Sequence, residues 1–150
     1  MTIGNPESFA VEFEYYDLNP KMGFARLWIN SKQLGVKEDL IYLNGYLISL
    51  IDQFLNSEKF HDLESKNEHE KFQILKSKKQ KFLIIGSTFI DDFEIYTYKD
   101  NSQICLVWKL RNDQKSIFRE LENYPTEIQS AIVTEKYLKE IKNKICDEIK

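Results

Sequence analysis

The sequence is poor in the residue clusters from which small catalytic and nucleotide sites are built. Its five glycines are scattered, and it contains neither a Gly-x-Ser-x-Gly elbow nor a Gly-x-x-x-x-Gly-Lys phosphate loop. A hydrolase nucleophile elbow and a backbone cradle for phosphates are therefore not expected. The two histidines, His61 and His69, lie in a polar stretch, and no second histidine follows His69 at the zincin spacing. We predict no catalytic residue, no cofactor and no metal site.

Cysteines and long apolar runs are also scarce. Cys105 and Cys146 lie far apart and neither belongs to a Cys-x-x-Cys pair, so we expect reduced thiols packed as small apolar side chains. The apolar runs are far shorter than the roughly 20 residues that cross a bilayer. No basic segment precedes the first of them, so no signal peptide is expected. These absences predict a cytoplasmic protein that does not contact membranes.

The composition is typical of a globular domain. The 150 residues are 42% hydrophobic and 30% charged, with ten Phe and eight Tyr. A chain of this length buries roughly 70% of its unfolded surface and needs neither a metal nor a disulfide to fold. We expect residues 1–150 to form a single domain.

Charge is distributed unevenly along the chain. Residues 1–75 carry 7 Lys and Arg against 12 Asp and Glu, a net charge of −5, whereas residues 76–150 carry 14 against 12, a net charge of +2. The acidic first half favours a basic partner over nucleic acid, although solvated surfaces explain it equally well. The short basic run from Lys76 to Lys81 has no aromatic side chain interleaved with it, so we interpret it as a solvated loop.

Alternating apolar residues predict two antiparallel hairpins. Residues 8–16 place apolar side chains on one face, Asn19–Gly23 is the expected turn, and residues 24–30 are the expected returning strand. Residues 93–99 and 103–111 predict the second hairpin. Trp28 and Trp108 both lie on predicted strands with apolar neighbours, so we expect them in the core.

Two helices are also predicted. Apolar residues recur at spacings of three and four over residues 43–55. A final helix is expected after Thr134, whose hydroxyl can accept from a backbone N–H of the first turn, and residues 127–133 before it are expected to be extended. Residues 56–81 stay ambiguous: they allow a short helix over 58–64, and a helix or an approach to a strand over 68–75. Together these patterns predict an α+β fold, an antiparallel sheet of about five or six strands with two main helices packed on it.

The densest acidic group is Asp91-Asp92-x-Glu94. Three carboxylates could hold a hard cation. Successive strand residues point to opposite faces, however, so only Asp92 and Glu94 would share a side. A turn before a strand is the simpler interpretation.

Both ends of the chain resemble a known family. The segment Ile3-Gly4-Asn5-Pro6-Glu7-Ser8-Phe9-Ala10-Val11-Glu12-Phe13-Glu14, the strand that ends in Trp28-Ile29-Asn30 and the segment from Tyr124 to Leu138 are similar to the forty-second immunity family of bacterial polymorphic toxin systems. The resemblance implies an intracellular antitoxin of the contact-dependent growth inhibition type. Such proteins bind and silence a toxin made by the same cell, often a nuclease.

The leading hypothesis is therefore stoichiometric binding of a cognate toxin domain that has a basic surface. An acidic partner can plug a basic cleft and associate quickly through charge steering. The candidate contacts are carboxylates on predicted strands and turns, first Glu12, Glu14 and Asp17 and then Asp92 and Glu94. The alternative is a small cytosolic enzyme or ligand-binding protein with a motif-free site, which would need a deep pocket with convergent polar groups.

Overall fold

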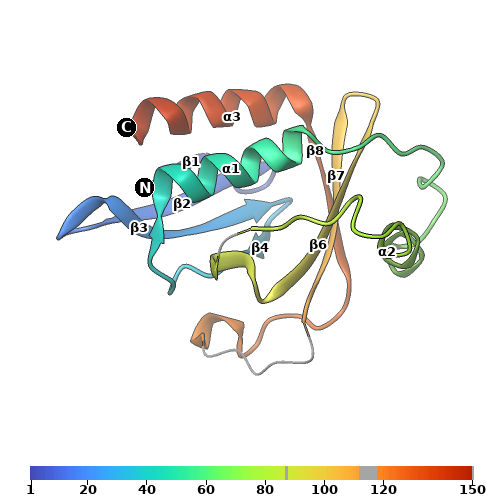
Figure 1. Ribbon diagram of the computed structural model, residues 1–150, viewed down its shortest axis with the longest axis horizontal. Coiled ribbons are helices and arrows are strands. Elements are labelled where there is room, and N and C mark those ends of the chain that lie inside the picture. Colours follow the sequence, from blue (N-terminus) through green and yellow to red (C-terminus); the bar gives the residue numbers. More distant parts are fainter. Residues whose placement is uncertain (87, 112–117, 150) are drawn as a thin grey trace.

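The strands form two antiparallel sheets, and helices pack on both of them (Figure 1). The computed structural model describes residues 1–86, 88–111 and 118–149. In the first sheet the order is β1-β2-β3-β4, and β5 pairs with the beginning of β3; the strands are β1 Thr2–Asn5, β2 Phe9–Tyr16, β3 Asn19–Ile29, β4 Lys32–Leu34 and β5 Ile41–Tyr42. The second sheet has the order β6 Phe93–Asp100, β7 Gln103–Leu110, β8 Gln129–Thr134. The helices are α1 Leu43–Leu55, α2 Glu68–Lys76 and α3 Glu135–Glu148, with short 3-10 turns η1 Thr88–Ile90 and η2 Arg119–Leu121.

The predicted α+β class is confirmed, but the strands form two sheets, because β6, β7 and β8 pair with one another and not with the first sheet. After β3 the chain turns sharply, back into β4 of the same sheet. Asn30 and Ser31 have φ angles of 49° and 66° and lead directly into β4. β8 meets this corner through side chains instead of a backbone ladder. The Ile132 amide donates to Asn30 Oδ1 at 2.9 Å, and Lys32 Nζ donates to the Ser130 carbonyl at 2.7 Å.

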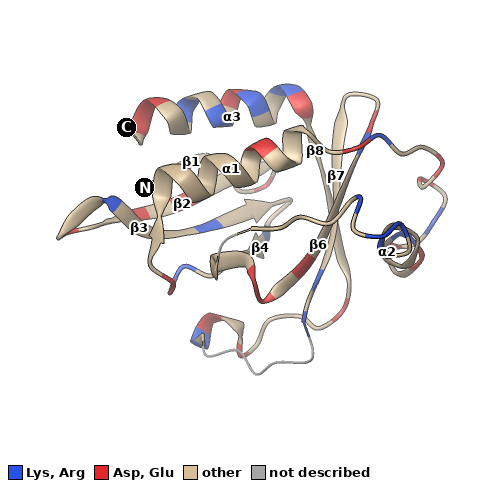
Figure 2. Cartoon of the chain, in the orientation of Figure 1, with Lys and Arg blue, Asp and Glu red and all other residues tan. Residues whose placement is uncertain are grey.

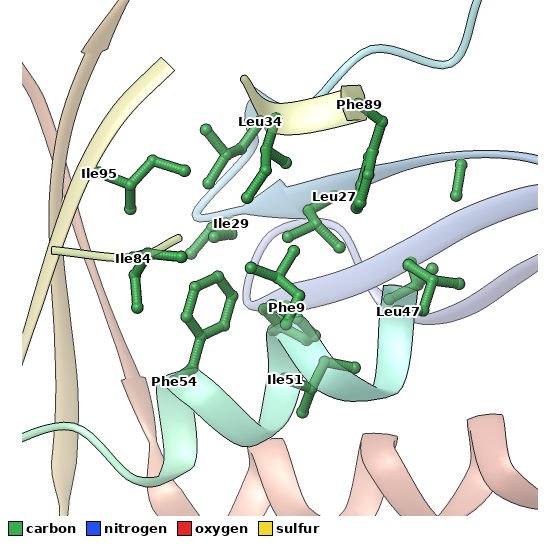
Figure 3. Packing of buried hydrophobic residues seen from close by; sticks show 14 of the residues in the cluster. Phe9, Leu27, Ile29, Leu34, Leu47, Ile51, Phe54, Ile84, Phe89 and Ile95 are labelled. Carbon is green, nitrogen blue, oxygen red and sulfur yellow. The ribbon is translucent and has the colours of Figure 1, made fainter. Parts of the chain in front are cut away.

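The main core lies between the sheets and helices α1 and α3, and Figure 3 shows part of it. The helix predicted over residues 43–55 is confirmed, and all five residues of its apolar stripe are at most 1% exposed: Leu43, Leu47, Leu50, Ile51 and Phe54. Burying a side chain of this size contributes about 1.5–3 kcal/mol. Packing therefore stabilises α1, although Gly45 lies in its first turn and no side chain caps its start.

A second, smaller core lies on the other face of the second sheet, under α2. Phe72 and Leu75 of α2 are fully buried there against Tyr96 and Val107. The ambiguous segment over residues 68–75 is thus a helix. A capping box explains its start, because Asn67 accepts from the Glu70 amide while the Glu70 side chain accepts from the Asn67 amide.

The helix that residues 58–64 would have allowed does not form. This segment instead runs beside β6, where the Phe60 amide donates to the Lys99 carbonyl and the Lys99 amide donates to the Glu58 carbonyl. The run Phe82-Leu83-Ile84-Ile85 covers the same edge farther along through the bridge between Leu83 and Tyr96. Both segments satisfy backbone groups that an open edge would expose.

The turn predicted at Asn19–Gly23 is wrong in position. The chain reverses earlier, at Asp17 and Leu18, so that Tyr16 pairs with Asn19. The next ladder pair joins Tyr15 to Gly23, which leaves residues 20–22 as an irregularity in β3. Met22 and Gly23 pair with Tyr42 and Ile41 of β5. The segment that was predicted to be a turn is therefore part of β3 and pairs with an additional strand.

Two packing predictions also need correction. Cys105 is buried as expected, but Cys146 is exposed on α3. Trp108 is fully buried, whereas Trp28 is partly exposed because it lies on the face of the first sheet opposite to the core. Both histidines are exposed, as predicted. Among the described helices, none has the length and apolar character needed to cross a membrane.

The predicted division of the C-terminal segment into strand and helix is confirmed, and it can be tested at Thr134. Its hydroxyl accepts from the Tyr137 amide at 3.2 Å. Thr134→Ala should lower the free energy of unfolding by about 1 kcal/mol, because a free amide at the helix start loses its acceptor. Urea denaturation measures this change. Thr134→Ser is the matched control and should keep most of the stability, and equal losses in both variants would contradict the capping role.

Candidate functional site

The first group of candidate carboxylates lies on the face of the first sheet that points away from α1 and α3. Glu12 of β2 is directly opposite Arg26 of β3. Its carboxylate accepts hydrogen bonds from Lys37 Nζ at 2.8 Å, from Trp28 Nε1 at 3.1 Å and from Arg26 Nη2 at 3.4 Å. Only 21% of the Glu12 side chain is exposed. The structure therefore places this carboxylate inside a cluster of donors.

Neighbouring side chains extend this cluster across the sheet. The Arg26 guanidinium lies 5.1 Å from the centre of the Trp28 ring, and its Nη1 is 3.5 Å from Glu120 Oε1. Lys37 Nζ is also 2.8 Å from Glu14 Oε1. Three carboxylates thus surround two cations, and most of the negative charge of this face is compensated locally.

The donors also determine the protonation of Glu12. Its burial would raise the pKa, but the hydrogen bonds from Lys37 and Trp28 and the charge of Arg26 outweigh that effect and lower the pKa to about 2. The hydrogen bond from Lys37 also lowers the pKa of Glu14. Both carboxylates are therefore ionised at neutral pH.

Glu14 and Asp17 are more accessible than Glu12. The Glu14 side chain is 62% exposed, and Asp17 is exposed in the two-residue turn between β2 and β3. No ion pair to Asp17 is present in the described part of the chain. These two residues are the members of the first group that a protein partner can reach.

The second group of candidates lies elsewhere, in the second sheet. Asp91 and Asp92 form a turn before β6, as predicted, and their carbonyls accept from Arg111. Glu94 is 9% exposed, accepts from the Tyr96 hydroxyl at 2.6 Å and is 3.4 Å from Lys76 Nζ. The structure does not bring this pair near Glu12, and Glu94 offers little surface to a partner.

Hollows in the described surface are open grooves, and some of the polar side chains that line them bond to other protein groups. A groove between α1 and residues 81–84 has a volume of about 610 Å³. On its floor the Ser57 and Thr97 hydroxyls are 2.7 Å apart, and on its rim Gln53 bonds both backbone groups of Ile85. Among the described residues, no three His, Cys, Asp or Glu side chains are placed to hold a metal ion. The arrangement can bind a partner through charge and shape.

Comparison with known proteins identifies the family. The model of immunity protein 42 (Imm42) matches residues 1–148. The chain belongs to the immunity protein 42 family. Its fold is also similar to the crystal structure of CdiI from Burkholderia dolosa AUO158, with a TM-score of 0.67 and 12% sequence identity over 99% of each chain. At this identity the likeness shows a shared fold. No curated protein matches the sequence.

The carboxylate cluster of this immunity family member contains residues that sequence patterns did not reveal. Arg26 could have been found, because the first hairpin places it across from Glu12 once the turn is known. Lys37 and Glu120 could not have been found from the sequence. Lys37 lies in the segment after the short strand β4, and Glu120 lies in η2, far from Glu12 along the chain. Trp28 was expected in the core and instead donates its indole N–H to a carboxylate on the other face.

Replacing Glu12 tests the cluster. Glu12→Gln should lower the free energy of unfolding at neutral pH by about 1–3 kcal/mol, because the buried donors lose a charged acceptor. The folded-state pKa is depressed from 4.5 to about 2, so this stabilisation is present above pH 4.5 and is lost as the pH falls toward 2. Urea denaturation from pH 7 to pH 2 should therefore show a smaller loss in the variant than in the wild type.

Glu14→Gln is the matched control for this experiment. The Glu14 carboxylate is far more exposed and contacts one cation, so its loss should change stability by less than about 1 kcal/mol. If the free energy of unfolding falls equally in both variants, the enclosed position of Glu12 is not the reason for the loss of stability.

Proposed function

We propose that the protein neutralises a cognate toxin by forming a stoichiometric complex with it in the cytoplasm of the cell that makes both. Membership of the immunity protein 42 family over residues 1–148 carries this proposal. The fold shared with CdiI supports a system of the contact-dependent growth inhibition type. Inhibition by binding also agrees with the groove beside α1, where the Ser57 and Thr97 hydroxyls bond to each other and Gln53 bonds to the Ile85 backbone.

A toxin with a basic surface is the partner that the accessible carboxylates favour. Glu14 and Asp17 lie close together at the β2–β3 turn and project from the first sheet. A nuclease has a cationic cleft for phosphates, and carboxylates that approach this cleft accelerate association through long-range attraction. Glu12 contributes indirectly, because it orders Lys37 between itself and Glu14. Asp92 and Glu94 are secondary candidates.

Growth rescue tests the function itself. The toxin domain encoded immediately upstream of this gene is expressed in a naive bacterial host, with and without the protein. We expect the domain to stop growth, the protein to restore it, and the two to co-purify in a one-to-one complex. A toxic domain that is neither bound nor neutralised by this protein would refute the proposal.

Charge reversal tests the contact. The double variant Glu14→Lys, Asp17→Lys should associate with the toxin domain roughly tenfold more slowly at low salt, with a smaller effect at high salt, because attraction becomes repulsion. Stopped-flow fluorescence measures the rate.

The matched control for this test is the double variant Glu64→Lys, Glu140→Lys. Glu64 lies before α2 and Glu140 lies on α3, and both are exposed, so this variant has the same change in net charge. Its association rate should stay within roughly twofold of the wild-type rate. Equal slowing in both double variants would show that net charge acts, and not the β2–β3 turn.

A further inference from the structure

Exposed apolar side chains gather at one end of the molecule, which we call the hairpin end. Eight large apolar side chains are exposed among the described residues, and six of them belong to this end: Met1, Tyr15, Leu18, Leu40, Tyr42 and Tyr46. The hairpin end comprises the N-terminus, the β2–β3 turn, residues 40–46 around the start of α1, and the last turn of α3, which lie together on the left of Figure 1. Contiguous apolar exposure of this kind marks interaction surfaces.

Specific contacts bring these segments together. The pairing of Met22 with Tyr42 places the start of α1 beside the base of the β2–β3 hairpin. Tyr46 lies one helical turn farther along the same helix. On the other side, the Tyr15 hydroxyl donates to the Glu148 carbonyl and so joins the hairpin to the end of α3. These contacts bring the segments that carry the exposed apolar side chains to the same end of the molecule.

Leu18 is the most exposed member and the fold does not require it. Its side chain is 83% exposed. Two-residue turns favour Asn and Gly, which adopt positive φ, yet neither Asp17 nor Leu18 has a positive φ. A leucine here neither shapes the turn nor packs against the core. A side chain that breaks a local preference without a structural gain indicates a functional position.

Charge at the two ends of the molecule selects the kind of partner. The opposite end, around α2, carries charges of both signs, with Lys71, Lys76, Lys78, Lys79 and Lys81 beside Glu64, Glu68 and Glu70 (Figure 2). At the hairpin end, Glu14, Asp17, Asp147 and Glu148 occur with Lys21, Lys37, Lys144 and the N-terminal amine, and no ion pair to Asp17, Asp147 or Glu148 is present among the described residues. The last turn of α3 has no basic residue, although the helix dipole is negative there. A basic partner is thus attracted to the hairpin end.

We propose that the hairpin end is the docking surface for the toxin domain, which meets it with an apolar groove bordered by Lys and Arg. This inference rests on the proposed function and names the surface that performs it. Leu18 and Tyr46 supply the apolar contact, and the carboxylate of Asp17 pairs with a cation at the border. Tyrosine and other large apolar side chains at the centre of an interface contribute most of its affinity.

Replacing the apolar contacts tests this surface directly. Leu18→Ser and Tyr46→Ser are each titrated with the toxin domain encoded upstream, by isothermal calorimetry at low and high salt. We expect the Kd to rise roughly tenfold or more in each variant, by a similar factor at both salt concentrations, because apolar contacts are not screened. Both side chains are exposed, so thermal unfolding should stay close to that of the wild type.

Ile132→Ser is the matched control, because Ile132 is a large apolar residue exposed on β8, outside the hairpin end. Its Kd should stay within roughly twofold of the wild type. If wild type binds and neither hairpin-end variant weakens binding, or if Ile132→Ser weakens it equally, the docking surface is wrong while the proposed function stands. If the wild-type protein neither binds nor rescues growth, the function and the surface are both refuted.

Discussion

The structure depends on the corner where β3 turns into β4. Asn30 and Ser31 adopt positive φ there, and the side chains of Asn30 and Lys32 bond to the backbone of β8. Tyr124 strengthens the same junction, because its hydroxyl accepts from Trp108 Nε1 and donates to the Gln33 carbonyl. These side-chain bonds satisfy backbone groups that a continuous sheet would pair. They connect the end of the first sheet to the second, and both sheets contribute to one core with α1 and α3.

The first sheet consequently has two faces with different physical roles. One face is apolar and packs on α1 and α3, while the other carries the enclosed carboxylate of Glu12 with its three donors. A carboxylate so bonded stabilises the fold and adds little field outside. Six of the eight exposed large apolar side chains among the described residues lie instead at the hairpin end, together with the exposed carboxylate of Asp17. The proposed docking surface thus lies around the turn of the first hairpin, which agrees with the general placement of binding residues on turns carried by a rigid scaffold.

Much of the fold could be predicted from the sequence, because its signals are local. The period of the apolar residues predicted α1 and both hairpins, and the Thr134 hydroxyl marked the start of α3. The predictions failed where a distant contact overrides local chemistry. Asn19–Gly23 has turn residues, yet pairing with β5 makes it part of a strand. Residues 58–64 could have formed a helix, yet they bond to β6. The same holds for the candidate site. The sequence identified the carboxylates, but it did not show which of them are enclosed by other side chains.

The sequence by itself determined the class of fold and the family, because periodicity, caps and family-specific segments are written along the chain. It also determined where carboxylates and apolar residues occur. Only the tertiary structure decided which of these groups remain available. Lys37, Trp28 and Arg26 converge on Glu12 from different positions in the chain, and the hairpin end forms from four segments that are distant in sequence. Exposure and neutralisation depend on neighbours in space, and the spacing of residues along a chain does not specify those neighbours.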